Sequence, residues 1–435
     1  MESYSATLQR IYNLRGGMID LRLDRMDRAL ALFDHPEKKF GSFHIAGTNG
    51  KGSTAAMLHR VLCLAGYRTA LYTSPHLVSF TERIRVSDRE ITAEDVVLLA
   101  QEIRKLTAAA DVPLTFFEFV TVMAFVYFAR QRVDVAVVEV GLGGRLDATN
   151  LVSPVVSVIT TISKDHEAYL GSELVSIARE KGGIIKPAVP VVCGSLTDEV
   201  AALLKSIAAE RGSPAYFLGR DYRFSLKNGG LFDYIGIKQY FPSLSLVLRG
   251  RHQRHNAALA IAALELAEGQ FPISEPVLRE GLSTVAWPGR LELMLDRPTV
   301  IVDGAHNGEG VHALVEEIKG CRQGRKVKLL FASMEDKDWA LMVSALTKVV
   351  DEVVFTRVDV ERSADPRRLA DQVTENIPHQ VIDNSRVALK SLLDAAQPDD
   401  IIIVAGSLYL LGEVRPMLQE AAQTRPATVN SSNSV

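Results

Sequence analysis

Several features that would place a chain in a special class are scarce in this sequence. Its 435 residues contain three cysteines, Cys63, Cys193 and Cys321, which lie far apart and show no paired metal-ligand spacing. The first ten residues, MESYSATLQR, lack the basic and then apolar pattern of a secretory signal. Together these observations predict a cytoplasmic protein, since such cysteine usage fits a reducing compartment.

Charge of one sign and long apolar runs are also missing. The net charge is −3, with 49 basic and 52 acidic residues mixed along the chain, which argues against a nucleic-acid surface or a membrane-binding basic patch. The most apolar window, residues 119–129, is too short to span a bilayer and predicts a buried helix instead. We therefore expect neither nucleic acid nor a membrane as a partner.

What the chain does have is an alternation of strand and helix patterns from residue 43 to about residue 195. Continuous apolar runs, typical of strands covered on both faces, indicate a parallel sheet between helices. These runs occupy residues 133–140, 154–163 and 189–194. Residues 221–248 differ, because the turn signal KNGG separates two alternating segments and predicts a small β insertion.

The alternation resumes after WPGR at 287–290, which has the composition of a linker. Strand patterns follow at 299–303, 327–333, 352–358 and 400–407. We predict an α/β protein with three parts. They are a P-loop ATP-binding domain with a parallel sheet over residues 1–287, a smaller, doubly wound Rossmann-like domain over 288–420, and a disordered tail over 421–435.

A candidate phosphate-binding loop, Gly-Thr-Asn-Gly-Lys-Gly, joins the strand pattern at 43–46 to the helix pattern at 53–64. Glycines let backbone N–H groups turn inward around an anion at a helix N-terminus. Lys51 can then reach the outer phosphates of a nucleotide, and Ser53 a magnesium ion. The loop departs from the standard P-loop because Gly52 separates these two residues. A plain turn is the structural alternative.

Other candidates follow the predicted strands, because open α/β sheets bind ligands at the carboxyl ends of strands. Glu139 is a candidate magnesium ligand, and Ser74 and His166 could complete the site, although imidazole suits magnesium less than oxygen ligands. A hydrogen-bonded surface histidine is the alternative. In the second half, Asp303 and Arg290 could contact a nucleotide or substrate. The alternatives are a helix N-cap at Asp303 or Asn307 and a hinge salt bridge of Arg290.

Taken together, these residues and their surroundings resemble the folylpolyglutamate synthase/dihydrofolate synthase family, in the wider group of Mur-type ATP-dependent ligases. The resemblance runs from about residue 18 to about residue 415. Its motifs are AGTNGKGST (46–54), YTSPHLVSFTERIRV (72–86), EVGLGGRLDATN (139–150), DHEAYLG (165–171), IAREKGGIIKP (177–187), HQRHNAALA (252–260), PGRLE (288–292), DGAHN (303–307), MEDKD (334–338) and AGSLYLLGEVR (405–415). The glycine between Lys51 and Ser53 belongs to this family's version of the loop.

The resemblance implies an activity. In this family ATP phosphorylates a carboxylate, and the amine of L-glutamate attacks the acyl phosphate to give an amide, ADP and phosphate. The implied cofactors are ATP and Mg²⁺, the substrates are a folate or dihydropteroate and L-glutamate, and we expect a monomer.

The resemblance also implies roles for individual residues. Nucleotide binding falls on Thr48, Asn49, Gly50, Lys51, Gly52, Ser53, Asn256, Arg290, Asp303 and His306. The implied magnesium ligands are Ser53, Ser74, Glu139 and His166. The implied catalytic residues are Lys51, His166 and Lys181. The implied pterin-binding residues are Thr115, Phe116, Phe117, Glu118, Leu146, Asp147 and Ala148, together with residues 20–24.

Lys181 matches a lysine that is carbamylated in relatives. A carbamate has two oxygens that can hold or orient magnesium as a carboxylate does. From chemistry alone the alternative is an exposed helix lysine that pairs with Glu180 or another carboxylate.

Three other functions fit parts of the pattern. A Mur ligase that acts on a cell-wall precursor carries a UDP-binding domain before the P-loop, whereas about 45 residues precede the loop here. A P-loop kinase leaves the phosphate on its product, whereas a ligase releases it. A nucleotide-dependent binding protein does not need Glu139, His166 and Lys181 together.

Overall fold

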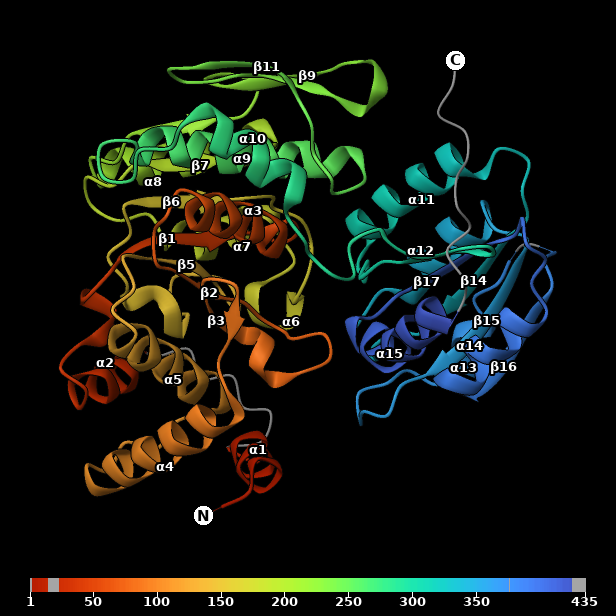
Figure 1. The fold of residues 1–435 in the computed structure, drawn as a ribbon, viewed down its shortest axis with the longest axis horizontal. Helices are drawn as coiled ribbons and strands as arrows, with labels where there is room; N and C mark the ends of the chain where they lie inside the picture. Colours follow the sequence, from red (N-terminus) through yellow and green to blue (C-terminus); the bar gives the residue numbers. More distant parts are fainter. Residues whose placement is uncertain (1, 15–22, 375, 425–435) are drawn as a thin grey trace. The chain divides into compact units, whose positions relative to one another are not determined.

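The structure is a computed structural model that describes residues 2–14, 23–374 and 376–424. The chain divides into two compact units (Figure 1). The first consists of Met1–Val247 and Arg251–Trp287, and the second of Leu248–Gly250 and Pro288–Val435.

The first unit is built on an eight-stranded sheet with the order β4-β3-β2-β5-β1-β6-β7-β8. Six strands, β2, β5, β1, β6, β7 and β8, run parallel to one another. At the edge beside β2, β3 pairs antiparallel with both β2 and β4. The central strands are buried on both faces, as their continuous apolar runs predicted. The strands are β1 Gly41–Ala46, β2 Thr69–Tyr72, β3 Ile84–Val86, β4 Arg89–Glu90, β5 Val135–Glu139, β6 Val156–Ile159, β7 Val191–Cys193 and β8 Ala215–Phe217.

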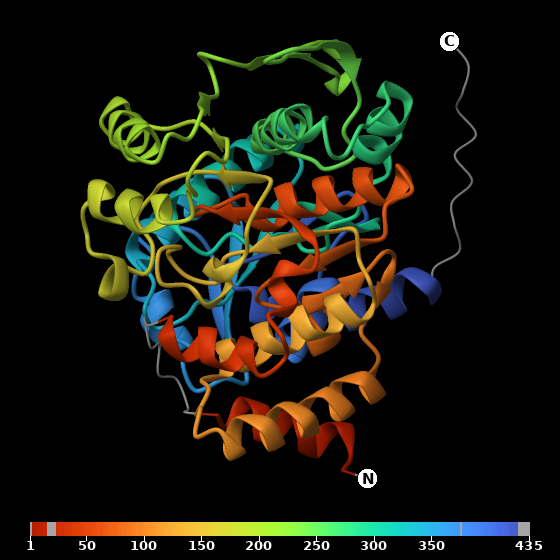
Figure 2. The same cartoon turned by 90° about the vertical axis from the view of Figure 1, so that its left-hand side faces the viewer.

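Helices cover both faces of this sheet (Figure 2). Helix α3 packs against α9 and α10 on one face, and α5 lies between the other face and α4. The buried helix predicted at 119–129 is confirmed as the centre of α5. The helices are α1 Tyr4–Tyr12, α2 Asp24–Ala31, α3 Lys51–Leu64, α4 Ala93–Ala109, α5 Phe116–Arg130, α6 Glu167–Leu170, α7 Leu174–Gly182, α8 Asp198–Glu210, α9 Arg251–Ala267 and α10 Glu275–Thr284.

The predicted β insertion is confirmed as a separate antiparallel sheet of β9 Arg223–Leu226, β10 Phe232–Ile235 and β11 Tyr240–Leu244. Glu265 of α9 anchors it, because its carboxylate accepts hydrogen bonds from Tyr234 Oη at 2.5 Å and from the backbone N–H of Gln239 at 2.8 Å.

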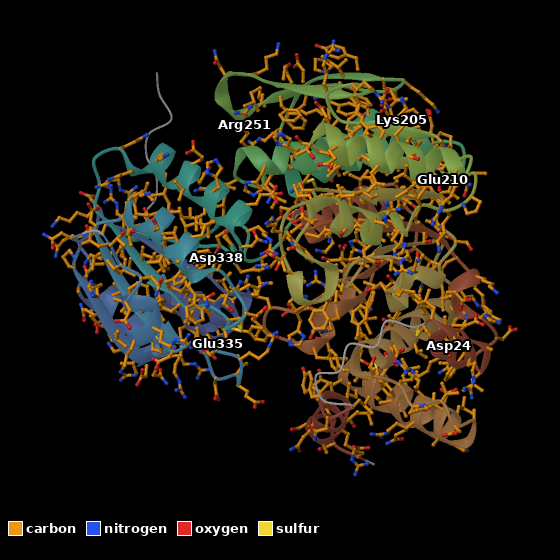
Figure 3. All side chains as sticks on the ribbon, turned by 180° about the vertical axis from the view of Figure 1, so that it is seen from behind. Asp24, Lys205, Glu210, Arg251, Glu335 and Asp338 are labelled. Atoms are coloured by element: carbon orange, nitrogen blue, oxygen red, sulfur yellow. The ribbon has the colours of Figure 1, made fainter. Side chains whose placement is uncertain are left out.

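The charged side chains of Lys205 and Glu210 lie on the outer face of α8 (Figure 3). In α8, Val200 and Leu204 are buried whereas Lys205 and Glu210 are exposed. This one-sided burial is typical of a surface helix. Within the described part of the chain, no helix is long and apolar enough to cross a membrane.

The second unit contains a six-stranded sheet with the order β12-β13-β17-β14-β15-β16, in which only β12 pairs antiparallel. Helices α11, α12 and α13 share a hydrophobic core with one face, and α14 and α15 pack on the strands and on each other. The elements are β12 Glu292–Asp296, β13 Thr299–Val302, α11 Gly308–Arg322, β14 Val327–Phe331, α12 Trp339–Thr347, β15 Glu352–Arg357, α13 Pro366–Ala370, β16 His379–Asn384, α14 Ser385–Asp394, β17 Ile401–Ala405 and α15 Leu408–Thr424.

One boundary was predicted wrongly. Residues 421–424 were assigned to the disordered tail, but they form the last turn of α15. The segment before Thr424 is rich in alanine, glutamate and glutamine, which favour a helix, and the apolar positions of α15 are buried. Residues 425–435 lie outside the described residues.

Candidate active site

The predicted phosphate-binding loop connects β1 to α3, and the segment after β6 holds it in place. Thr48 exchanges two hydrogen bonds of 3.0 Å with the backbone of Ser163, and its N–H donates to Thr161 O at 2.8 Å. The same segment holds Asn49, because Thr160 Oγ1 donates to the backbone carbonyl oxygen of Asn49 at 2.6 Å. Two loops at the carboxyl ends of neighbouring strands are thus joined into one surface.

Two glycines of the loop are required by the backbone and by their neighbours. Gly47 and Gly50 have φ values of 150° and 85°, which favour glycine. A methyl group at Gly50 would collide with the amide oxygen of Asn256. Asn256 is buried in α9 and bonded to Gln253 Oε1 at 3.0 Å. The structure therefore places Asn256, which the resemblance assigned to nucleotide binding, directly against the loop.

Two lysines converge on the start of the loop. Lys51 Nζ donates to the carbonyl oxygens of Gly47 and Thr48, each at 3.0 Å. Lys181 Nζ, from α7, donates to the same Gly47 oxygen at 2.8 Å, and its side chain is buried. Burial, and then the nearby charge of Lys51, lower the pKa of Lys181 to about 7.

The surface alternative for Lys181 is therefore wrong. Lys181 is 5% exposed, and the neighbouring Glu180 pairs with Arg145 at 2.9 Å. A buried amine whose pKa lies near neutrality is what carbamylation requires, because the neutral amine reacts with CO₂.

The structure brings together two of the four predicted magnesium ligands. Glu139 ends β5 with its carboxylate buried, and Ser74 N–H donates to Glu139 Oε2 at 3.3 Å. Ser53 is buried in the first turn of α3. His166 is exposed at the start of α6, where its φ is 53° and its N–H donates to Asp165 Oδ1 at 2.9 Å.

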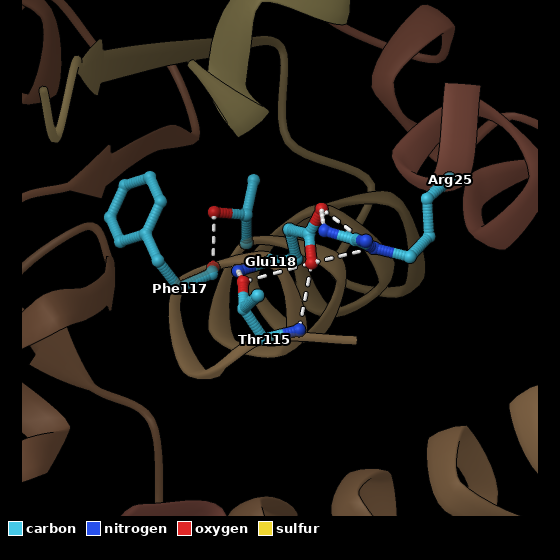
Figure 4. A network of polar contacts seen from close by, with 5 residues as sticks. Arg25, Thr115, Phe117 and Glu118 are labelled. Carbon is cyan, nitrogen blue, oxygen red and sulfur yellow. Dashed lines mark hydrogen bonds and ion pairs between the residues drawn. The ribbon is translucent and has the colours of Figure 1, made fainter. Parts of the chain in front are cut away.

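At the predicted pterin side, the Glu118 carboxylate is occupied by protein groups (Figure 4). Arg25 of α2 forms an ion pair of 2.6 Å with it, and both side chains are buried. The same carboxylate accepts from the backbone N–H of Thr115 at 2.7 Å and from Thr115 Oγ1 at 2.8 Å, which forms a capping box for α5. Glu118 and Thr115 thus fix the start of α5 rather than offer free donors or acceptors.

The two phenylalanines beside them are less enclosed. The Phe116 ring stacks on Tyr12 with a centroid distance of 5.5 Å, and the Arg83 guanidinium lies 5.4 Å from its centre. The Phe117 ring tip occupies the space that a side chain at Gly141 would need. Phe117 thereby connects the start of α5 to the GLGG loop that follows Glu139.

Asp147 also has a structural role. Its buried carboxylate accepts from Leu142 N–H at 2.8 Å, Thr149 N–H at 3.0 Å and Thr149 Oγ1 at 2.5 Å. Burial raises the pKa of Asp147, and these hydrogen bonds oppose the rise. Leu146 is half-buried and Ala148 is buried. Residues 20–22 of the predicted pterin stretch lie outside the described residues, and Asp24 begins α2.

In the second unit the predicted residues gather at the carboxyl end of β13. Asp303 accepts from Leu291 N–H at 2.8 Å and Ala305 N–H at 2.9 Å, so it is not a helix cap. Burial raises its pKa, which the charge of Arg290 opposes. His306 Nδ1 lies 2.7 Å from Gly304 O. The helix cap predicted as an alternative for this segment is Asn307, whose Oδ1 accepts from Gly310 N–H at 2.9 Å.

Comparison with known proteins decides the family. Residues 45–264 match the Mur ligase middle domain, and residues 289–408 match the Mur ligase, glutamate ligase domain. The dihydrofolate synthase/folylpolyglutamate synthase of Bacillus subtilis (strain 168) is 35% identical over 408 residues, which cover 91% of this chain and 95% of that protein. The chain belongs to the folylpolyglutamate synthase/dihydrofolate synthase family of Mur ligases.

Solved structures of this family share its fold. E. coli FolC in complex with DHPP and ADP is 31% identical, with a TM-score of 0.90 and coverage of 97% of this chain and 98% of that chain. The bifunctional folylpolyglutamate synthase/dihydrofolate synthase of Yersinia pestis c092, complexed with AMPPNP and Mn ion, is 32% identical, with a TM-score of 0.87 and coverage of 96% and 98%. The predicted α/β fold is confirmed, and the chain is an ATP-dependent ligase that forms amide bonds.

The first unit of this synthase fits a nucleotide and a divalent metal ion. The loop presents the N-terminus of a 14-residue helix, which favours phosphate. The Glu139 carboxylate and the hydroxyl groups of Ser53 and Ser74 are hard oxygen donors of the kind that Mg²⁺ prefers. Among the described residues, no cluster of three or more His, Cys, Asp and Glu side chains could hold a metal ion without other ligands.

Arg25, which pairs with Glu118 on the predicted pterin side, is a residue that the motifs missed. It lies on the buried side of a short helix whose other buried residues are Met26, Ala29 and Leu30. A charged residue among apolar positions of an amphipathic helix is the signal that points to a buried partner, although the sequence does not say which.

Proposed function

We propose that this ligase adds L-glutamate both to a folate and to dihydropteroate, with ATP and Mg²⁺ as cofactors. The observation that carries the proposal is the convergence of Lys51 and Lys181 on Gly47, at a glycine loop that opens a helix beside the buried carboxylate of Glu139. In this arrangement Lys51 and the N–H groups at the start of α3 supply positive charge where phosphate charge must be held.

The proposed reaction is the one that the resemblance to the family implies. The acceptor carboxylate attacks the γ-phosphorus of ATP, the bond to ADP breaks, and an acyl phosphate forms. The amine of glutamate then attacks the acyl carbon, loses a proton, and expels phosphate. Lys51 reduces the repulsion between the two anions in the first step. Ser53, Ser74 and Glu139, with His166 as the family resemblance implies, would hold a Mg²⁺ ion, which would supply further positive charge at the phosphates.

Acceptance of dihydropteroate is supported by the named activities of the B. subtilis relative and by the aromatic start of α5. The test incubates purified protein with ATP, Mg²⁺ and glutamate and offers dihydropteroate or a reduced folate in separate reactions. Mass analysis should find one added glutamate on each acceptor, together with free phosphate. If only the folate gives a product, the proposed addition of glutamate to dihydropteroate is contradicted. A phosphorylated product would indicate a kinase.

The same proposal includes a monomeric, cytoplasmic enzyme. Light scattering at assay concentrations should give the mass of one chain, 47.7 kDa. A mass of two chains under the same conditions contradicts this part of the proposal.

A further inference from the structure

The end of the first unit lies along the phosphate-binding helix α3. A methyl group at Gly281 of α10 would lie 2.5 Å from Val61 Cγ2, so the two helices are in close contact there. Arg60 Nε donates to Thr284 Oγ1 at 3.1 Å. Helix α10 ends at Thr284, and the chain continues toward residue 287, the last residue of this unit.

That last residue, Trp287, lies against the first turn of α3. A methyl group at Gly52 would be 2.8 Å from Trp287 Cζ2 and 3.0 Å from its Nε1. Gly52 has no positive φ, so the constraint at this position is space rather than backbone conformation. Any larger residue at position 52 must displace the indole ring or the turn.

We propose that Trp287 is a positioning residue of the phosphate loop. Its indole ring fills the space beside Gly52 and holds the first turn of α3, so that Lys51 and Ser53 keep their orientation toward the phosphates. This explains physically why glycine separates the two residues in this chain. The role rests on the proposed ATP-dependent function.

The first test uses complementary volumes. Gly52→Ala should raise the KM for ATP roughly ten-fold and leave the KM for glutamate unchanged, because the added methyl displaces the turn. Gly52→Ala/Trp287→Leu should recover most of the loss, because the smaller side chain makes room. Gly320→Ala is the matched control, since Gly320 is also helical and nothing lies within 4 Å of an added methyl group. A double variant no better than Gly52→Ala overturns the proposal.

The second test uses fluorescence. The chain has two tryptophans, so Trp339→Phe leaves Trp287 as the only indole. Trp287 is half-buried, and its emission should change on titration with ADP and Mg²⁺, with the midpoint that calorimetry gives for ADP binding. Trp287→Phe should retain near-normal KM for ATP, whereas Trp287→Ala should raise it.

The two proposals can fail separately. ADP binding without a change in Trp287 emission overturns the positioning role and leaves the ligase function intact. Normal ADP binding and emission change without glutamate addition contradict the proposed reaction, while the positioning role stands. Absence of ADP binding by calorimetry contradicts both.

Discussion

Lys51 and Lys181 donate to the same atom, the carbonyl oxygen of Gly47, at 3.0 and 2.8 Å. Two amines this close cannot both carry a proton without repulsion, and Lys181 is also buried. The loop therefore holds an amine that titrates near neutral pH beside a second lysine. The two lysines call for different tests.

Lys51→Ala should lower kcat/KM by about 100-fold or more while the fold is retained, because one preorganised charge at the phosphates is lost. Phosphate release measures the rate, and thermal unfolding reports the fold. Lys205→Ala, on the exposed face of α8, is the control and should be unchanged. Near-normal turnover of Lys51→Ala would show that the loop has only a structural role.

Lys181 should carry a carbamate in the active enzyme. Because burial and Lys51 lower its pKa from 10.5 to about 7, the neutral amine predominates above pH 7, and bicarbonate-dependent activity should rise between pH 6 and 8. Lys181→Ala should lose activity and regain part of it with short carboxylic acids. Native mass spectrometry should detect the added CO₂.

Lys186 is the matched control for this experiment. It is half-buried, with a pKa lowered to about 8 by burial and then by Arg211, and its Nζ donates to Asn150 O at 2.6 Å. Short carboxylic acids should not restore activity lost in Lys186→Ala. Equal rescue of both variants, or full activity of Lys181→Ala, contradicts the carbamate.

The pKa of Lys181 also predicts how stability depends on pH. Without CO₂, the unfolded chain binds a proton at this lysine between about pH 7 and 10.5 that the folded chain lacks. Stability should therefore rise with pH over this window, and the rise should be smaller in Lys181→Met. Urea unfolding at pH 7 and pH 9 compares the two proteins, and an equal pH dependence would contradict the assignment.

Glu118→Gln should destabilise the protein by about 3–5 kcal/mol, because it leaves the buried Arg25 charge without its partner. It should also raise the KM for the acceptor more than the KM for ATP, since the start of α5 is on the predicted pterin side. The exposed pair Arg130–Glu102, at 2.6 Å, joins the end of α5 to α4 and is the control. Glu102→Gln should cost about 1 kcal/mol or less in urea unfolding. Similar losses in both variants would contradict the argument from burial.

Thr149→Val should lower the free energy of unfolding by about 1–3 kcal/mol, because buried polar groups lose a partner. Thr149 Oγ1 lies 2.5 Å from Asp147 Oδ1 and 2.9 Å from His44 Nε2. Burial, and then the charge of Lys186, lower the pKa of His44 to about 3, so His44 is neutral and needs no counter-charge. Thr149→Ser keeps the hydroxyl and should stay close to the parent protein in urea unfolding. If Thr149→Ser loses as much free energy of unfolding as Thr149→Val, the effect comes from packing of the methyl group instead.

The sequence by itself determined the strands that are buried on both faces and the loop that joins β1 to α3. Mostly apolar runs mark β5, β6 and β14 because burial on two faces disfavours polar residues. The edge strands β12 and β16 were missed, since a partly exposed edge permits mixed residues.

Only the tertiary structure decided which side chains are available to a ligand. Arg25 and Glu118 are 93 positions apart, and Lys181 is 134 positions from Gly47. The sequence marked Glu118 and Asp147 as candidates for contact with the pterin, and the structure adds that their carboxylates bind Arg25, Thr115 and Thr149. Motifs identify residue types at the carboxyl ends of strands, whereas packing between distant segments decides which partners those residues already have.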